Sequence, residues 1–254
     1  MPAKLIDGKK IADNLLLNIK KQVPKLKKRP GLAIILIGNN PASELYLRLK
    51  KEACEKAGIT FHSYLLEQDS SEEKIIEVIK FLNNDPDITG ILVQLPLPKK
   101  FDTDKIIQAI DPAKDVDGFH PNSKFISPNV LGIIELIKST GEDLTNKKIT
   151  ILSNSIKFIK PFKKLLPNNK ISSKDLKANI LIVALGNPHY IKPEMIKKDA
   201  ILIDVGINKI KNKVIGDIDP ACDKIAAWRS PVPGGVGPMT IAMLLKNLID
   251  KNIE

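Results

Sequence analysis

Short apolar runs alternate with longer amphipathic stretches along the chain, and this alternation constrains the fold most strongly. The run from Gly31 to Gly38 is apolar almost throughout, as expected for a strand buried in a parallel sheet. Such alternation is typical of βαβ units, so we predict an α/β fold with parallel sheets. The expected strands are 31–38, 61–66, 89–94, 148–152, 178–185 and 200–205; the expected helices are 8–23, 41–58, 71–82, 128–138 and 239–250.

The alternation is interrupted once, which indicates two lobes. It stops at Pro96 and Pro98 and starts again after Asp111-Pro112. A length of 254 residues suits one large domain or two small ones, and the interruption favours two. We therefore expect one lobe over 1–120 and a second over 121–237, with the C-terminal helix, about 238–254, packing back on the first lobe.

The composition excludes several classes of protein. The formal net charge is +11, but only Arg29, Arg48 and Arg229 are arginines and aromatic residues make up 4%, which argues against nucleic-acid binding. Cys54 and Cys222 cannot form a disulfide framework. The apolar runs are too short to span a bilayer, and no signal peptide is visible. We expect a cytoplasmic protein with a lysine-rich, solvated surface and no membrane partner.

Polar residues follow several of the expected strands. In a parallel sheet, ligands gather outside the carboxyl ends of the strands. Gln94 stands out, because a buried strand delivers its amide into a loop stiffened by two prolines. A structural amide with satisfied hydrogen bonds is the alternative interpretation. The other residues in such positions are Asn39, Asn40, Asn187, Asp204 and Asn208.

Two further patterns could carry chemistry. Tyr46 and Lys50 are four residues apart on one expected helix and so share a face; a Lys held in such a place can exchange protons, although a solvated helix face would give the same spacing. The stretch from Lys114 to Gly118 contains Asp115 and Asp117, which suit a cationic or amine-bearing ligand, or else a simple turn. The ligands of a calcium loop are missing, and the scattered histidines exclude zinc, so no metal is expected.

Together, these strings resemble one family. They are Leu5-Ile-Asp-Gly-Lys9, Pro41-Ala-Ser-x-x-Tyr46-x-x-x-Lys50, Gly90-Ile-Leu-Val-Gln-Leu-Pro-Leu-Pro98, Lys114-Asp-Val-Asp-Gly-Phe-His-Pro121, Asp204-Val-Gly-Ile-Asn208 and Pro231-Val-Pro-Gly-Gly-Val-Gly-Pro-Met-Thr240. In this order they resemble the bifunctional methylenetetrahydrofolate dehydrogenase/methenyltetrahydrofolate cyclohydrolase family (FolD type). The resemblance covers nearly the whole chain.

The resemblance implies a fold and a chemistry. The fold would be a catalytic α/β lobe and a Rossmann-like nucleotide lobe with a cleft between them. The activity would be NADP-dependent oxidation of 5,10-methylenetetrahydrofolate, followed by hydrolysis of the methenyl product to 10-formyltetrahydrofolate. The implied catalytic residues are Lys50, which handles the proton of the attacking water, and Gln94, which positions it, with Tyr46 and Asp117 binding the folate. Substrate would also meet Pro233, Gly234 and Gly235, and NADP would meet Ser153, Asn154, Ser155, Gly186, Asn187, Pro188, Gly206, Ile207 and Asn208.

The nucleotide lobe departs from the family pattern. Where the family has Gly-(Arg/Ala)-Ser-x-x-Val-Gly-x-Pro, this chain has Ser153-Asn-Ser-Ile-Lys-Phe-Ile-Lys-Pro161, so Ser153 and Ile159 replace both glycines. Because those glycines allow close approach to the pyrophosphate and to the strand, Ile159 should obstruct both. The segment that follows is also short, and it is expected to lack the family's next strand.

Three interpretations follow. In the first, the second lobe still binds NADP, and Lys157 or Lys160 supplies positive charge to the phosphates. In the second, only the hydrolytic half-reaction persists. In the third, the protein binds folate without catalysis. Intact Lys50 and Gln94 favour an enzyme. NADP and NAD are both compatible with the sequence, because the altered segment would read the 2′-phosphate. The resemblance also implies a homodimer formed through the second lobe.

Overall fold

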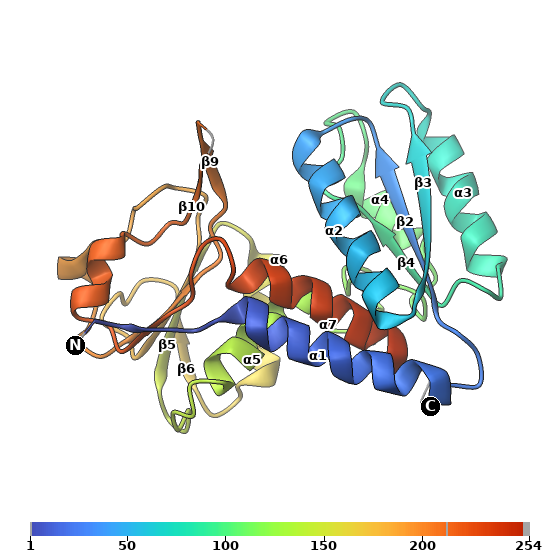
Figure 1. Ribbon diagram of the computed structural model, residues 1–254. Coiled ribbons are helices and arrows are strands. Elements are labelled where there is room, and N and C mark those ends of the chain that lie inside the picture. The colour runs from blue at the N-terminus through green and yellow to red at the C-terminus, as the bar shows by residue number, and fades with distance from the viewer. Residues whose placement is uncertain (1, 212, 251–254) are drawn as a thin grey trace. The chain divides into compact units, whose positions relative to one another are not determined.

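The computed structural model describes residues 2–211 and 213–250, and this part of the chain divides into two compact units. One unit comprises residues 13–128 and the chain from 241 onward, and contains a three-stranded sheet. The other comprises the chain up to residue 12 and residues 129–240, and contains a six-stranded sheet. We call them the three-stranded unit and the six-stranded unit; Figure 1 labels their elements.

In the three-stranded unit, β2 lies at the centre of a parallel sheet and both faces are covered. The order is β3-β2-β4, with β2 at Gly31–Ile37, β3 at Thr60–Leu66 and β4 at Gly90–Val93. Alternate residues of β2 enter two different cores, Leu32 and Ile34 one, Ala33 and Ile35 the other. This explains why β2 reads as a continuous apolar run.

Helices supply the rest of each core. On one face lie the end of α1 (Gly8–Gln22), α2 (Pro41–Ala57) and the part of α7 (Val236–Asp250) that belongs to this unit. On the other face lie α3 (Glu72–Asn84) and α4 (Thr103–Gln108). Where α7 packs on β4 the fit requires glycine, because a Cβ on Gly90 would come within 2.6 Å of Leu248 and 2.7 Å of Val116.

In the six-stranded unit, every strand of the main sheet runs parallel, in the order β1-β11-β8-β7-β5-β6. Helices α5 (Pro128–Lys138) and α6 (Ile156–Leu165) belong to this part of the chain, and β9 (Asn208–Ile210) pairs with β10 (Lys213–Ile215) in a separate hairpin. Short 3-10 turns lie at Pro193–Met195 and Pro220–Lys224, and another lies in the three-stranded unit at Val23–Lys25. The main strands are β1 Lys4–Leu5, β11 Trp228–Arg229, β8 Ile201–Asp204, β7 Ile180–Ala184, β5 Lys148–Ser153 and β6 Lys170–Ser172.

The predicted α/β fold with parallel sheets is confirmed, with two corrections in detail. The strand expected to be missing after residue 161 is present as β6, which pairs with β5 from Lys148–Lys170 to Thr150–Ser172. Helix α7 begins at Val236, earlier than the predicted Met239, and Pro238 lies in its first turn, where no amide donor is needed. Residues 251–254 of the predicted C-terminal helix lie outside the described residues.

The units also differ from the expected division at residue 120. Residues 2–12 belong with the six-stranded unit, because β1 pairs with β11. Residues 121–128 belong with the three-stranded unit, where Phe125 packs on the core and Asn247 of α7 donates to the Ile126 carbonyl at 3.0 Å. Leu244, Leu245 and Leu248 of α7 lie in that same core.

Each sheet contains one point where the strand order reverses. The chain leaves β2 for β3 on one side and returns to β4 on the other; likewise it leaves β5 for β6 and returns to β7. At such points, the loops beyond neighbouring strands diverge and leave room for a ligand. Sites are therefore expected beyond the carboxyl ends of β2 and β4 in one unit, and of β5 and β7 in the other.

Candidate functional site

Helix α2 carries Lys50 on its buried face. The helix begins at Asn40, whose side chain accepts from the amides of Ala42 and Ser43 at 3.0 and 3.1 Å, and it ends at Gly58, which has φ +78°. Lys50 is 7% exposed. The interpretation of residue 50 as part of a solvated helix face is therefore wrong. Asn40, which the sequence marked as available to a ligand, is a helix cap.

The Lys50 ammonium meets Gln94 beyond the end of β4. Lys50 Nζ donates to Gln94 Oε1 at 2.9 Å, while Gln94 Nε2 donates to the Leu95 carbonyl at 2.8 Å. The second bond fixes the orientation of the amide, so its oxygen faces the lysine. The backbone N–H of Gln94 donates to the Ile35 carbonyl at 2.8 Å, and this bond holds Gln94 beside the central strand. Lys50 and Gln94 thus lie at the point where the strand order reverses.

In the stretch from Lys114 to Gly118, the side chains of Lys114 and Asp115 hold the local backbone in place through hydrogen bonds. Lys114 Nζ donates to the carbonyls of Leu82 and Asp85 at 2.9 and 2.8 Å. Asp115 is buried, and its Oδ2 accepts from the His120 amide at 2.8 Å. Of the two carboxylates that the local pattern left equivalent, Asp115 holds the turn.

The turn after Asp117 is held from two directions. Gly118 has φ +71°, and a Cβ there would lie 2.8 Å from the Phe125 carbonyl oxygen. The buried Asn247 of α7 donates to the Val116 and Ile126 carbonyls, both at 3.0 Å. Sequence analysis missed Asn247; its one signal is an amide within the apolar face of the last helix.

Burial sets the protonation behaviour of this group of residues. Burial lowers the pKa of Lys50, and the negative charge of Asp117 offsets part of that shift. Burial raises the pKa of Asp117 to about 6, against the opposing effect of Lys50. The pKa of Tyr46 is raised by burial, so its phenol stays protonated at neutral pH. A lysine with a lowered pKa, a fixed amide and a nearby carboxylate can together move one proton beside a cationic ligand.

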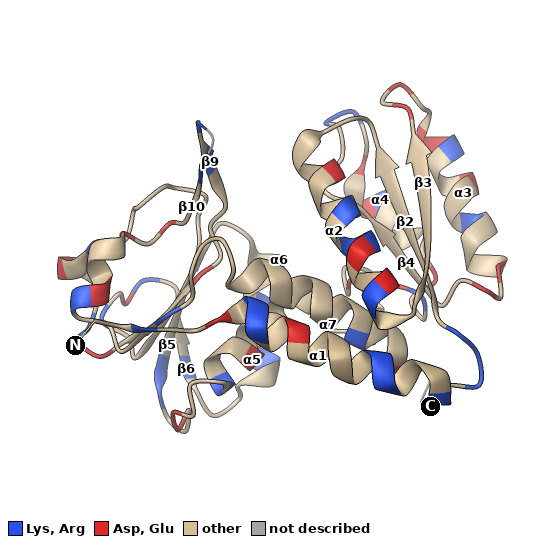
Figure 2. Ribbon diagram, viewed as in Figure 1, with Lys and Arg blue, Asp and Glu red and all other residues tan. Residues whose placement is uncertain are grey.

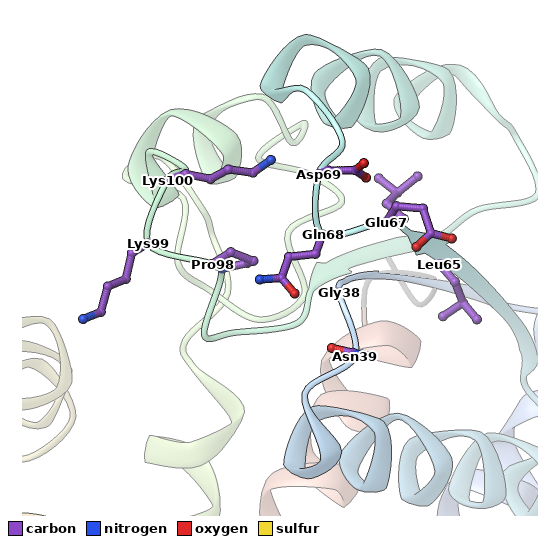
Figure 3. A pocket seen from close by; sticks show the side chains of 10 residues that line it. Gly38, Asn39, Leu65, Glu67, Gln68, Asp69, Pro98, Lys99 and Lys100 are labelled. Carbon is purple, nitrogen blue, oxygen red and sulfur yellow. The ribbon is translucent and has the colours of Figure 1, made fainter.

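A hollow of about 760 Å³ opens beyond the ends of β2 and β3 in the same unit. Figure 3 shows its lining, in which the Lys99 side chain points away from the others. The walls combine Glu67 and Asp69 with Lys99 and Lys100, so their charge favours neither anions nor cations. Gly38, Asn39, Leu65, Leu66, Gln68 and Pro98 complete the lining. Of these, sequence analysis singled out only Asn39.

In the six-stranded unit, the turn between β5 and α6 carries three residues predicted to bind the nucleotide. Ser155 caps α6, with its Oγ accepting from the Phe158 amide at 3.3 Å. Ser153 Oγ accepts from the Ser155 amide at 3.1 Å, and Asn154 is exposed. The altered sequence therefore still forms a strand–turn–helix connection at the reversal of strand order.

The prediction that Ile159 obstructs packing of the helix on the strand is wrong. Helix α6 contacts β5, and its fully buried residue is Phe162, whose ring meets that of Phe158 edge to face at 5.4 Å. Ile159 is half-buried beside them. Helix α6 thus forms and reaches β5 although an isoleucine stands where the sequence pattern has a glycine.

Two other predicted nucleotide-binding segments follow β7 and β8. Gly186, Asn187 and Pro188 are exposed after β7, and Gly186 has φ +67° with nothing within 4 Å of its Cβ position. After β8, Ile207 is 55% exposed and Asn208 donates through Nδ2 to Asp217 Oδ1 at 2.8 Å.

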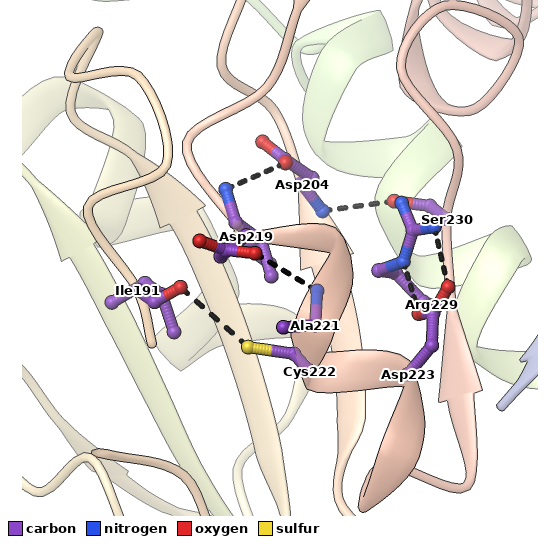
Figure 4. A network of polar contacts seen from close by, with 9 residues as sticks. Ile191, Asp204, Asp219, Ala221, Cys222, Asp223, Arg229 and Ser230 are labelled. Atoms are coloured by element: carbon purple, nitrogen blue, oxygen red, sulfur yellow. Dashed lines mark hydrogen bonds and ion pairs between the residues drawn. The ribbon is translucent and has the colours of Figure 1, made fainter. Parts of the chain in front are cut away.

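Asp204 and Gly206 have structural roles. Figure 4 shows Asp204 beside Ser230, whose Oγ accepts the Asp204 amide proton at 2.8 Å; the Asp204 carboxylate accepts from the Ile218 amide at 2.9 Å. Burial raises the pKa of Asp204 to about 6, against three backbone hydrogen bonds that lower it. A Cβ on Gly206 would collide with the Asp217 carboxylate, so this glycine is required by packing inside the protein. Sequence analysis missed Asp217, one of two closely spaced acids after a short strand.

The segment predicted to approach the substrate through glycines also packs closely on its own unit. Gly234 has φ +104°, and its carbonyl accepts from the Lys9 amide at 2.9 Å. A Cβ on Gly235 would lie 2.6 Å from the Pro231 carbonyl oxygen, and one on Gly8 would collide with Gly235. Pro233 follows Val232 through a cis peptide bond. Contact of Pro233, Gly234 and Gly235 with a substrate stays a prediction.

The remaining features of the described residues concern metal binding, membrane insertion and surface charge. Across residues 2–211 and 213–250, no group of three or more metal-ligating side chains comes together, and no helix has the length and apolarity needed to cross a membrane. Figure 2 shows basic and acidic residues side by side along α2 and α3, so the excess of lysine forms no single-sign stripe on these helices.

Comparison with known proteins identifies both halves of the chain. Residues 6–117 match the model of the tetrahydrofolate dehydrogenase/cyclohydrolase catalytic domain, and residues 127–253 match the model of the NAD(P)-binding domain of the same family. The bifunctional protein FolD of Acetivibrio thermocellus is 42% identical over 275 residues, covering 98% of this chain and 96% of that protein.

Solved structures agree. FolD from Campylobacter jejuni, a methylenetetrahydrofolate dehydrogenase/cyclohydrolase, superposes with a TM-score of 0.94 at 36% identity, covering 99% of both chains. The Trypanosoma brucei enzyme, complexed with NADP and an inhibitor, gives 0.92 at 28% identity, covering 100% of this chain and 98% of that one. The resemblance found in the sequence is confirmed, and this chain belongs to the tetrahydrofolate dehydrogenase/cyclohydrolase family.

Proposed function

We propose that this chain is a bifunctional enzyme of one-carbon metabolism. It oxidises 5,10-methylenetetrahydrofolate to the methenyl compound with NADP and hydrolyses that product to 10-formyltetrahydrofolate. Membership of the family over both domains supports the pair of activities. The observation that carries the hydrolytic half is the buried Lys50, bonded to Gln94 at 2.9 Å and electrostatically coupled to Asp117.

The hydrolysis can be derived from these three side chains. The methenyl bridge is cationic, and the oxygen of a water molecule bonds to its carbon while neutral Lys50 accepts one proton. The bond from that carbon to N5 then breaks; N5 gains a proton as the carbinol oxygen loses its own and becomes the formyl oxygen. One proton per turnover leaves through Lys50. A lowered pKa suits Lys50 to this role, because the neutral amine must be available.

Gln94 and Asp117 support that transfer in different ways. Gln94 Oε1 accepts from Lys50 and fixes its position, since the same amide is tied to Leu95. Asp117 favours positive charge nearby, both the folate cation and the protonated lysine. Tyr46, one turn before Lys50 on α2, offers a ring for stacking and a phenol that stays protonated.

The dehydrogenase half is assigned to the six-stranded unit. Bound NADP would supply the hydride acceptor for oxidation of the methylene carbon. The segments at 153–155, 186–188 and 206–208 would hold it; they follow three adjacent strands, and two of them flank the reversal of strand order. That position, the exposed backbone at Gly186 and the intact turn into α6 fit a dinucleotide.

Substitution of Lys50 tests the hydrolytic assignment. We expect Lys50→Met to slow hydrolysis of 5,10-methenyltetrahydrofolate about 1,000-fold, the size of effect typical of a general acid–base group. Lys51→Met is the matched control, because Lys51 is the exposed neighbour on the same helix. Equal hydrolysis by wild type and Lys50→Met would refute the assignment of Lys50 and favour a binding protein without this catalytic residue.

A nucleotide-binding measurement separates the bifunctional enzyme from a hydrolase alone. We expect calorimetry to detect NADP binding, and methylenetetrahydrofolate to drive formation of NADPH. Ser153 and Ile159 are the residues that make this test necessary, since they replace two glycines of the family pattern. Absence of binding at millimolar NADP, with hydrolysis intact, would leave only the cyclohydrolase; a parallel titration with NAD compares the two nucleotides.

We also propose that the enzyme is cytoplasmic, as its composition led us to expect, and that it forms a homodimer through the six-stranded unit, as the family resemblance implied. Light scattering during size-exclusion chromatography measures the mass. A mass of one chain at micromolar concentration would contradict the dimer.

A further inference from the structure

Asp217 is a buried carboxylate whose hydrogen bonds all go to the loops beside the proposed nucleotide site. It is 0% exposed. Its Oδ2 accepts from the amides of Leu185 and Gly186 at 2.7 and 3.0 Å. Its Oδ1 accepts from the Asn187 amide and from Asn208 Nδ2, both at 2.8 Å. Four donors match the acceptor capacity of a carboxylate, so Asp217 is satisfied within the protein.

The backbone on either side of Asp217 holds the other end of the same loop. The His189 amide donates to the Gly216 carbonyl at 3.1 Å, and the Ile191 amide donates to the Asp217 carbonyl at 3.0 Å. Residues 185–191 are therefore held before and after Pro188. Gly186, Asn187 and Pro188 remain exposed between these attachments. The loop is thus held from within while its outer face stays open.

A second carboxylate positions the first. Asp204 Oδ1 accepts from the amides of Gly206 and Asp217 at 3.0 and 2.9 Å, and its Oδ2 accepts from the Ile218 amide at 2.9 Å. The two acids interlock with two glycines, since a Cβ on Gly206 would strike Asp217 and one on Gly216 would strike Asp204. Movement of Asp217 relative to β8 would therefore break several bonds together.

The location of these loops distinguishes a role in ligand binding from one in stability alone. The donors to Asp217 come from the loop after β7 and from Asn208 after β8, at the carboxyl ends of neighbouring strands. Ile207, between the two residues that Asp204 and Asp217 hold, is 55% exposed. Ligand affinity at such a site depends on the groups that hold the loops, because ordering a mobile loop on binding costs free energy.

We propose that Asp217 is a positioning residue for NADP: it holds the loops 185–188 and 206–208 in the arrangement that receives the dinucleotide. It touches no ligand itself. The proposal rests on the proposed dehydrogenase function, and it adds a specific residue through which the lobe keeps a preformed site despite the altered turn at 153–159.

Asp217→Asn tests the proposal with little change in shape. The new NH₂ group faces N–H donors, so at least one backbone amide loses its acceptor. We expect the Kd for NADP, measured by calorimetry, to rise about tenfold, and the KM for NADP to rise more than kcat falls. Hydrolysis of 5,10-methenyltetrahydrofolate, assigned to the other unit, should stay within about twofold of wild type.

Two further variants sharpen the result. Asp219→Asn is the matched control two residues away; it alters an ion pair with Lys192 at 2.7 Å and keeps an acceptor for the Ala221 amide, so the Kd should not change. Asn208→Asp in the Asp217→Asn background reverses one donor–acceptor pair, and we expect it to recover part of the lost affinity. A role in stability alone predicts lower Tm values with an unchanged Kd below the transition.

The outcomes separate this proposal from the function on which it rests. A wild-type protein that binds no NADP overturns the dehydrogenase function and the role of Asp217 with it. Wild-type binding together with an unchanged Kd in Asp217→Asn overturns the role of Asp217 alone. If Asp217→Asn does not fold, Asn208→Ala removes one of the four donors, and a Kd equal to wild type would overturn the proposal.

Discussion

The two units both bury ionisable groups near the carboxyl ends of parallel strands but give them opposite hydrogen-bonding environments. Beyond β4, the Lys50 ammonium donates to Gln94 and lies near Asp117. Beyond β8, the carboxylates of Asp204 and Asp217 accept three and four hydrogen bonds, mostly from backbone amides. An ammonium has three protons to donate, whereas these carboxylates have little capacity left.

The difference separates proton transfer from positioning. A group that must gain and lose a proton needs two charge states of similar free energy, and burial of Lys50 brings its states closer together by lowering the pKa. A group that must hold loops needs as many fixed partners as it can accept, because each unsatisfied donor near it would cost free energy. Buried groups near the carboxyl ends of parallel strands are therefore suited to proton transfer in one unit and to holding loops in place in the other.

The largest expected effect comes from breaking the interlocked acids. A Cβ at Gly216 would occupy the position of an Asp204 carboxylate oxygen, so Gly216→Ala forces a buried charge off its backbone donors. We expect the six-stranded unit to lose about 4 kcal/mol of unfolding free energy, as when a buried charge loses its partner. Urea denaturation followed by fluorescence measures this, since the single tryptophan, Trp228, lies in that unit.

Gly186→Ala is the control for that substitution. Gly186 has φ +67°, but its Cβ position is open, so alanine introduces backbone strain without a collision. A loss of about 1 kcal/mol is expected. Equal losses in the two variants would show that glycine's backbone freedom matters and that the interlocking with Asp204 does not.

An intermediate effect comes from adding a charge beside Lys50. In Gln94→Glu a carboxylate would face the ammonium and raise the pKa of Lys50, so less neutral amine exists at a given pH. Hydrolysis should fall about 100-fold at pH 7, and the pH at half-maximal rate should move upward. The kcat for 5,10-methenyltetrahydrofolate, measured across pH, checks this. An unmoved midpoint would mean that another group takes the proton.

Asp117→Asn should move the same midpoint in the opposite direction. Asp117 raises the pKa of Lys50, so its removal lowers that pKa and shifts the rising limb of kcat to lower pH. The KM should increase, since a carboxylate proposed to bind the folate is lost. Because the pKa of Asp117 is about 6, wild type should show a related rise in KM as the pH falls through 6. If the pH at half-maximal rate moved in the same direction in Gln94→Glu and Asp117→Asn, the result would contradict electrostatic control of the pKa of Lys50.

Much of this arrangement could be predicted from sequence, because local pattern determines it. The continuous apolar run of β2 predicted a strand buried on both faces, and the position of Gln94 after β4 predicted an amide at the edge of a sheet. Whether Lys50 or Asp117 was buried could not be predicted, since a spacing of four residues does not show which helix face packs inward. The roles of Lys50 and Asp117 in catalysis and folate binding were predicted from the family resemblance.

The unpredicted residues are those whose role depends on distant parts of the chain. Asp217 acts on residues about thirty positions earlier, and Asn247 acts on carbonyls more than one hundred and twenty positions away. Neither belongs to a local motif. The wrong prediction for α6 has a different origin, because the buried residue of that helix, Phe162, lies only three positions after Ile159 and the pattern did not show that it packs inward.

The smallest effect comes from restoring that glycine. Ile159 is a half-buried residue within α6, whose fully buried residue is Phe162. We therefore expect Ile159→Gly to cost about 1 kcal/mol through helix propensity. The Kd for NADP should change less than about twofold if the site depends on the loops held by Asp217. Calorimetry and urea denaturation of the same preparation measure both quantities. Tighter binding of NADP by Ile159→Gly would instead show that the isoleucine limits approach to the phosphates. The departure from the family sequence at this position would then lower the affinity of the six-stranded unit for NADP.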